Sequence, residues 1–146
     1  MRFLTVIFAS IWMAFGFAAH ADDTVEAVVA RAIEAHNAHD IDGFLATLAE
    51  DVSFHNLDGD TLLEGRETVR EIWSARFASN PDLIAEITHR TVVGNRVVDE
   101  ERLCMSGLDA PCIDLVAIYT VEGGLIQTMH VIQAEPASSD DGEVAQ

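Results

Sequence analysis

The chain has 146 residues, of which 25 are Asp or Glu and 8 are Lys or Arg, so its formal net charge is −17. A surface this acidic repels phosphate backbones, which excludes nucleic acids as partners. Its 49% of apolar residues excludes a disordered acidic chain, and its length fits one small domain.

The first 21 residues have the features of a signal peptide. Arg2 supplies a positive charge, residues 3–17 are almost wholly apolar, and Ala19-His20-Ala21 fits the small-x-small pattern before a cleavage site. We therefore predict that residues 1–21 are removed on export to the periplasm or the cell exterior, which leaves no stable membrane anchor. A transmembrane anchor is the alternative, but the apolar run from Phe3 to Ala19 is at the short end of the roughly 17–25 residues that a span needs.

The two cysteines, Cys104 and Cys112, flank a loop that contains Gly107 and Pro111 and joins two apolar runs. This arrangement is typical of the two ends of a β-hairpin, and an exported protein can keep a disulfide there. We predict one intramolecular disulfide. Zinc is the alternative, but two cysteines without CxxC spacing are a weak signal for a four-ligand site, so we expect no metal and no cofactor.

The first part of the mature chain is predicted to be helical. Apolar residues recur at helical spacing from Val25 to His36, after an acidic start. A turn at residues 40–43 leads to a second short helix over 44–48. A third helix is expected over 67–77, before Asn80-Pro81 stops it.

Strands dominate the rest of the chain. The first is expected over residues 52–57, followed by a turn at 58–60. Helices followed by a run of antiparallel strands indicate an α+β domain over 22–134. Residues 135–146 lack periodicity, which predicts a disordered acidic tail. The four later strands are expected near 84–93, 96–105, 112–121 and 125–134.

Four segments, by their order and spacing, resemble the SnoaL-like branch of the nuclear transport factor 2-like superfamily. They are AHNAHDIDGFLATLAEDVSFHN, EGRETVREIW, VVDEERL and VEGGLIQTMHVI, and the resemblance runs from about Val25 to Gln133. It implies a cone in which three helices close over a strongly curved antiparallel sheet and leave an apolar pocket. Members include ketosteroid isomerases, polyketide cyclases, limonene epoxide hydrolases and binding proteins, so the fold alone does not define an activity.

The positions that carry ketosteroid isomerisation are vacant. Where those enzymes have a Tyr and a carboxylate base, this chain has Ala32 and Asn56. Their protonated Asp falls on Val116, or on Ala117 if the last turn is gapped. An amide cannot take a proton from a carbon acid at neutral pH, so this activity is not expected.

Limonene epoxide hydrolases give a closer but broken match. They hold a water with a Tyr and an Asn and activate it with an Asp-Arg-Asp trio. Phe54 replaces the Tyr, whereas Asn56 and Arg102 match. Cys104 and Val131 fall on the two Asp positions, so neither the base nor the acid of that reaction is present.

Strand pairing predicts which residues face the pocket. If Cys104 lies opposite Cys112 in an antiparallel hairpin, Arg102 pairs with Asp114. This register predicts an ion pair beside the disulfide. The resemblance separately implies that Arg102 faces the pocket.

The last hairpin extends this register. A two-residue turn at 123–124 would pair Val116 with Val131, and the same pairing would place Ile118 opposite Met129. The resemblance puts Val131 in the pocket as well. We therefore predict one inward set: Arg102, Asp114, Val116, Ile118, Met129 and Val131, with Phe54 and Asn56 from the first strand and His36, Trp73 and Phe77 from the helices.

Each polar member of this set has a structural alternative to a functional role. His36 is a catalytic candidate because His titrates near neutrality, although a satisfied core histidine is the more common case. Arg102 and Asp114 are candidates for catalysis or for a ligand clamp, and a structural ion pair is the alternative. Asn56 either binds a carbonyl group or caps a strand end.

Other candidates have simpler explanations. Trp73 and Phe77 are spaced for a helix face that packs in the core. His55 and His130 alternate away from the predicted pocket.

Residues that alternate with the inward set would form an apolar outer face, which predicts a homodimer packed sheet to sheet. These are Ile113, Leu115, Ala117, Tyr119 and Ile132.

Together these features predict an exported protein that binds a small apolar or amphipathic molecule. One alternative is an isomerase, cyclase or hydrolase that uses His36 or the Arg102–Asp114 pair. Another is a structural homodimerisation module with a filled core.

Overall fold

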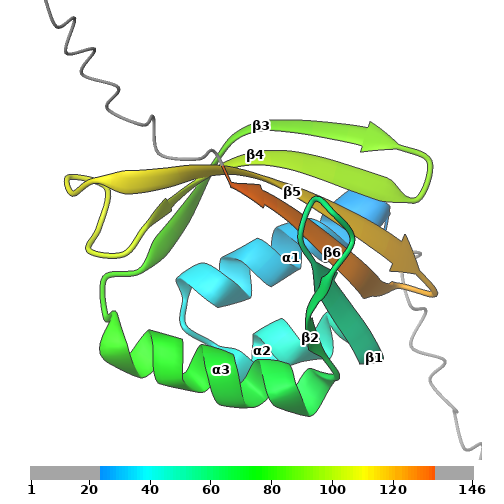
Figure 1. The fold of residues 1–146 in the computed structure, drawn as a ribbon, viewed down its shortest axis with the longest axis horizontal. Helices are drawn as coiled ribbons and strands as arrows, with labels where there is room; N and C mark the ends of the chain where they lie inside the picture. The colour runs from blue at the N-terminus through cyan, green and yellow to red at the C-terminus, as the bar shows by residue number, and fades with distance from the viewer. Residues whose placement is uncertain (1–23, 134–146) are drawn as a thin grey trace, which may run out of the picture.

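The computed structural model describes residues 24–133 and contains three helices and six strands (Figure 1). The predicted signal peptide (1–21) and acidic tail (135–146) lie outside the described residues. None of the helices within 24–133 is long and apolar enough to cross a membrane. In chain order the elements are α1 (Val25–Asn37), α2 (Ile41–Ala46), β1 (Leu48–His55), β2 (Thr61–Glu64), α3 (Arg66–Ser79), β3 (Ile84–Val93), β4 (Arg96–Cys104), β5 (Cys112–Glu122) and β6 (Leu125–Gln133).

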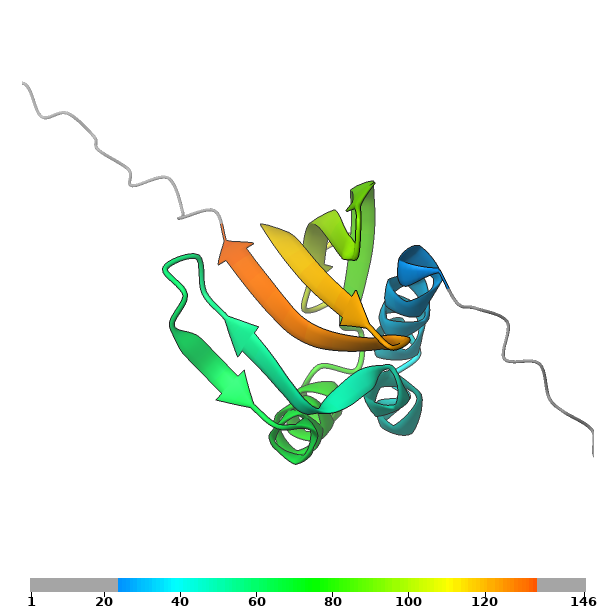
Figure 2. The ribbon, with the colours of Figure 1, turned by 90° about the vertical axis from the view of Figure 1, so that its right-hand side faces the viewer.

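The strands form one six-stranded sheet in the order β2-β1-β6-β5-β4-β3. The sheet is mixed, because β1 runs parallel to β6 while the other neighbours are antiparallel. The three helices lie against one face, and Figure 2 shows how β6 bends along its length so that the sheet closes over them. The predicted α+β cone is confirmed, with one parallel pair that the sequence analysis did not anticipate.

Local sequence explains where the helices start. The Thr24 side chain accepts a hydrogen bond from the Ala27 amide and caps α1. Asp40 caps α2 in the same way through the Gly43 amide, so the segment predicted as a turn is the start of this helix. As a result α2 covers residues 41–46 rather than 44–48.

The strands agree with the predicted ranges except at the first hairpin. β1 starts at Leu48, four residues before the predicted start, and the strand β2 was not predicted. β2 is short and exposed, which gives little periodic signal. The predicted turn at residues 58–60 is present, with Gly59 at a φ of 88°, a conformation that favours glycine.

The register of β4 against β5 is as predicted, with Cys104 opposite Cys112 and Arg102 opposite Asp114. The register of β5 against β6 is not. An extra residue in β6 shifts the pairing between Thr120 and Val121. Because one residue of slip exchanges the two faces of a strand, this bulge changes which side chains lie together.

Candidate functional site

The bulge brings Met129 opposite Tyr119 and Val131 opposite Ala117. The prediction had instead paired them with Ile118 and Val116. Met129 and Val131 do face the helices, and so the neighbouring residues of β5 on this inner face are Leu115, Ala117 and Tyr119.

Arg102, Asp114, Val116 and Ile118 therefore lie on the opposite side, which we call the outer face. Their predicted place in the pocket is wrong. The error came from assigning Arg102 to the pocket. The β4–β5 register was correct, so Asp114, Val116 and Ile118, which share a face with Arg102, were assigned to the pocket with it. Leu115, Ala117 and Tyr119, predicted to point outward, are buried.

A cavity of about 760 Å³ lies between the inner face and the helices. Of the predicted pocket residues, it includes His36, Phe54, Asn56, Trp73, Met129 and Val131. Phe77 is buried behind it, against the rings of His36 and His39. Other lining residues are Ala32, Ile33, Phe44, Arg76, Glu101, Leu103, Met105, Leu115, Ala117 and Tyr119, with Leu57, Leu62, Ile72 and Ile113 where the wall reaches solvent.

The cavity has a closed end and an open end. Along β5, the exposed fraction is 5% at Tyr119 and 9% at Leu115, and rises to 42% at Ile113. The same trend leads from buried Glu101 on β4 to the partly exposed Met105, which follows the end of this strand. Tyr119 and Glu101 therefore lie towards the closed end.

The closed end contains a buried polar network that the sequence analysis missed. The Tyr119 hydroxyl donates to Glu101 Oε1 at 2.7 Å, and both side chains line the cavity. Next to them on β4, Asp99 is fully buried. Arg90 of β3 donates to both of its carboxylate oxygens, at 2.7 and 2.6 Å.

Arg90 is the one positive charge in this network, which contains two carboxyl groups. Asp99 and Glu101 are two buried carboxyl groups on one strand face, and Arg90 uses its two hydrogen bonds on Asp99. Burial raises the pKa of Glu101 to about 7, an effect that the Tyr119 hydrogen bond opposes and nearby Asp99 reinforces. Burial also raises the pKa of Tyr119 well above its ordinary value, so the phenol keeps its proton. A carboxyl group that titrates near neutrality inside a cavity is a candidate functional group.

His36 forms part of the wall from α1. The Asn37 amide is oriented by two bonds to Ala85, one donated to its carbonyl and one accepted from its N–H, both 2.8 Å long. Asn37 Oδ1 therefore accepts from His36 Nδ1 at 3.2 Å, and Nε2 of the neutral ring is left as an acceptor. Burial lowers the pKa of His36, which keeps the ring neutral near pH 7.

His39, three residues after His36, is held by contacts of its own. Its Nε2 lies 2.9 Å from the Leu83 carbonyl and its ring stacks on Phe77. Across residues 24–133, no group of three or more His, Cys, Asp and Glu side chains is arranged to hold a metal ion.

Helix α3 contributes Arg76 and Trp73 to the cavity wall. The Arg76 guanidinium lies 4.8 Å from the centre of the Trp73 ring, which packs against Phe44 and Phe54. The indole N–H of Trp73 is the one buried side-chain N or O atom of the described residues that lacks a hydrogen-bond partner.

Asn56 has a structural role at the end of β1. Its amide oxygen accepts from the Asp60 N–H at 2.8 Å, and its amide nitrogen donates to the Asp60 carboxylate. It thus closes the β1–β2 turn, one of the two roles that the sequence left open.

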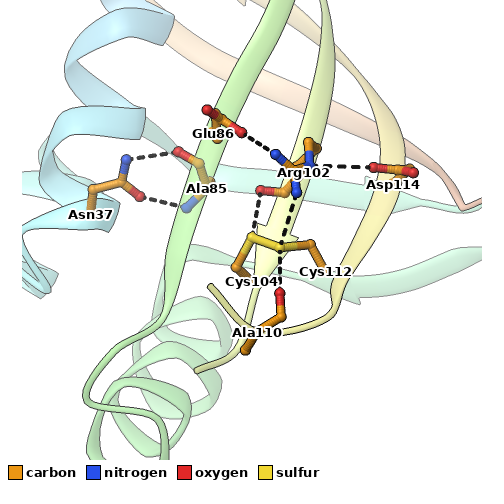
Figure 3. The surroundings of a disulfide bond; sticks show 8 residues. All are labelled: Asn37, Ala85, Glu86, Arg102, Cys104, Ala110, Cys112 and Asp114. Atoms are coloured by element: carbon orange, nitrogen blue, oxygen red, sulfur yellow. Dashed lines mark hydrogen bonds and ion pairs between the residues drawn. A yellow bond between two sulfur atoms is a disulfide. The ribbon is translucent and has the colours of Figure 1, made fainter. Parts of the chain in front are cut away.

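The Arg102 region lies at the outer face beside the disulfide Cys104–Cys112 (Figure 3). Arg102 donates to Glu86 at 2.8 Å and approaches Asp114 at 4.0 Å. Arg102 and Glu86 are half exposed and Asp114 is mostly exposed. The predicted Arg102–Asp114 ion pair is therefore present but does not reach the cavity.

The outer face also holds His55 and His130, as predicted. Their rings stack at 4.9 Å. Val116 and Ile118 are the apolar residues of β5 on this face, in place of those that the sequence analysis had put there. Ile132 of β6 pairs with Val116 and stays on this face as predicted. The homodimer remains a prediction, now through Val116, Ile118 and Ile132.

Comparisons with known proteins agree on the fold. The sequence profile of the SnoaL-like domain matches residues 29–129. A cystatin-fold protein of Novosphingobium aromaticivorans is 29% identical with a TM-score of 0.68, over 75% of this chain and 97% of that one. No functionally curated protein matches.

Two further solved structures show the fold alone. A protein of Sinorhizobium meliloti named as a candidate polyketide cyclase is 19% identical, with a TM-score of 0.60 over 71% of this chain and 92% of that one. A protein of Kribbella flavida named as a candidate ketosteroid isomerase is also 19% identical, with a TM-score of 0.62 over 84% and 88%.

Proposed function

The chain belongs to the SnoaL-like domain family, and we propose that it binds a small apolar or amphipathic molecule between its sheet and helices. The observation that carries this proposal is the cavity. Its volume of about 760 Å³ is within the range of small-molecule sites, as is its largely apolar wall with a few polar groups.

Trp73 offers a direct test. The chain has two tryptophans, so a protein that starts at Asp22 has Trp73 as its single tryptophan, in the cavity wall. We expect saturable quenching of Trp73 by the apolar probe 2-acetylnaphthalene. Ala117→Leu, which fills space on the inner face, should weaken binding, whereas Val116→Leu on the outer face should not. Absence of saturable quenching in the unmodified protein, or equal binding by both variants, would contradict the proposal.

Native mass spectrometry addresses the natural occupant. The protein would be purified gently from its own exported fraction and compared under native and denaturing conditions. A mass released on denaturation would identify the chemical class of the ligand.

A second candidate is an enzyme that moves a proton on its bound molecule. It is favoured by Glu101, whose pKa near 7 suits a general acid or base. This role replaces the one considered for Arg102 and Asp114, which lie outside the cavity. His36 stays a catalytic candidate because it lines the cavity. Incubating a released ligand in D₂O should give deuterium incorporation that Glu101→Gln abolishes. Equal incorporation with both proteins would exclude Glu101 from catalysis.

Export is proposed from two features. The Cys104–Cys112 disulfide suits an oxidising compartment, and residues 1–21 have a signal-peptide pattern. The intact mass of the protein from an exported fraction should correspond to a chain that starts at Asp22. A mass that includes residues 1–21 would contradict cleavage.

The homodimer is proposed to form through the outer face around Val116 and Ile118. Sedimentation at micromolar concentration should give the mass of two chains, and Ile118→Glu should give one. A monomer in the unmodified protein would contradict this pairing.

A further inference from the structure

The closed end of the cavity is richer in acceptors than in donors. Glu101 presents carboxylate oxygens, one of which already accepts from Tyr119. Because the Tyr119 proton is used in that bond, the phenol oxygen has only lone pairs left to offer. Elsewhere in the wall, His36 likewise offers Nε2 as an acceptor.

The same end has fewer positive than potentially negative groups. Its two carboxyl groups, Asp99 and Glu101, are matched by one arginine, Arg90, whose two short bonds go to Asp99. An ionised Glu101 in an apolar cavity needs a positive partner, and without one it takes up a proton. The closed end is thus complementary to a group that brings both a positive charge and several donors.

We propose that the ligand is an apolar amine, bound with its ammonium group on Glu101 and Tyr119. This inference rests on the proposed binding function and names the class of molecule. An ammonium group carries three donors and no acceptor, which matches the carboxylate and phenol oxygens. A ketone, by contrast, has only acceptors and would need a protonated Glu101.

Helix α3 favours the same orientation. The Arg76 guanidinium repels an ammonium group, so the amine lies at Glu101 rather than beside Trp73. The aromatic rings of Phe44, Phe54 and Trp73 supply the apolar wall between the two ends.

The proposal predicts a specific pH dependence. The charged and titratable groups around Glu101 are Tyr119 on β5, Asp99 on β4 and Arg90 on β3, while His36 and Arg76 face the cavity from α1 and α3. With a Glu101 pKa of about 7, the ionised fraction rises from roughly one tenth at pH 6 to nine tenths at pH 8. A ligand that binds only the ionised form should bind about tenfold more tightly at pH 8.

Calorimetry with three probes of matched shape tests this: 2-(aminomethyl)naphthalene, 2-(hydroxymethyl)naphthalene and 2-acetylnaphthalene. At pH 8 we expect the amine to bind at least tenfold more tightly than the alcohol, and at pH 6 the preference should shrink by about tenfold. Glu101→Gln should abolish the preference. The matched control Glu86→Gln removes a carboxylate from the outer face and should leave the preference unchanged.

Each other outcome has a defined meaning. Equal binding of amine and alcohol at pH 8, or an amine preference that survives in Glu101→Gln, overturns the amine proposal but not ligand binding. Binding of the ketone at pH 8 as tightly as the amine also overturns it, since the closed end would then offer a donor rather than acceptors. If no probe binds at either pH, the proposed binding function fails with it.

Discussion

On the inner face of β4, Asp99 is fully buried and holds Arg90 through two hydrogen bonds, whereas on the outer face of the same strand Arg102 reaches Glu86 with 43% of its side chain exposed. Both are arginine–carboxylate pairs between β3 and β4. A solvated pair contributes little to stability, while removing one partner of a buried pair leaves a charge without compensation. The comparison shows that the face of the strand, rather than the pair itself, decides the consequence of losing it.

The largest effect is expected from Asp99→Ala. This change leaves Arg90, whose side chain is only 17% exposed, without its partner and should lower the free energy of unfolding by about 3–5 kcal/mol. Urea denaturation monitored by circular dichroism measures it. A loss below 1 kcal/mol would mean that the inner pair behaves like the outer one.

Glu101→Gln should act in the opposite direction, and only at higher pH. The pKa of Glu101 is raised from 4.5 to about 7, so the folded protein retains a proton that the unfolded chain releases between these values. Stability from this group is therefore full below pH 4.5 and falls as the pH rises to 7. Gln does not titrate, so the variant should be more stable than the unmodified protein by about 3 kcal/mol at pH 8, and by less than about 1 kcal/mol at pH 5.

The measurement is urea denaturation of both proteins at the two pH values. Glu86→Gln serves as the control, because its half-exposed carboxylate should show no comparable dependence. The same difference in stability at pH 5 and pH 8 would contradict a raised pKa at Glu101.

Removing the disulfide tests whether it is needed to hold β4 and β5 in register. Replacing Cys104 and Cys112 together by Ala should cost about 2.6 kcal/mol, because the short closed loop no longer restricts the unfolded chain. Urea denaturation of the double variant and of the reduced unmodified protein should agree. A double variant that is as stable as the oxidised protein would show that strand pairing alone sets the register.

The smallest effect is expected on the outer face. Glu86→Ala removes the 2.8 Å contact to Arg102 and should change the free energy of unfolding by about 0–1 kcal/mol. The effect should shrink further in high salt. If Glu86→Ala lowered the free energy of unfolding as much as Asp99→Ala, the inner and outer ion pairs would contribute equally to stability, contrary to this prediction.

Most of the fold could be predicted from the sequence because its signals are local. Periodicity marked α1, α3 and the four long strands, and glycines marked the hairpins. The parallel pairing of β1 with β6 could not be predicted, because it depends on a long-range contact with no local sequence signal.

The site was harder to predict for a physical reason. Strand β4 carries acidic residues on both faces, with Glu100 beside Asp99 and Glu101, so its alternation does not reveal the buried side. The bulge in β6 then reversed the register on which the prediction depended. One available signal was Arg90, a cation in the neighbouring strand that could compensate a buried carboxylate.

The two hydrogen bonds between Asn37 and Ala85 have a consequence for self-association. β3 is an edge strand, and such strands present free N–H and C=O groups to which a strand of another chain can add. At Ala85 both groups are already bonded by the Asn37 side chain (Figure 3). A strand from another chain could pair at Ala85 only by displacing the Asn37 side-chain amide. This one side chain of α1 therefore opposes aggregation through this part of the edge.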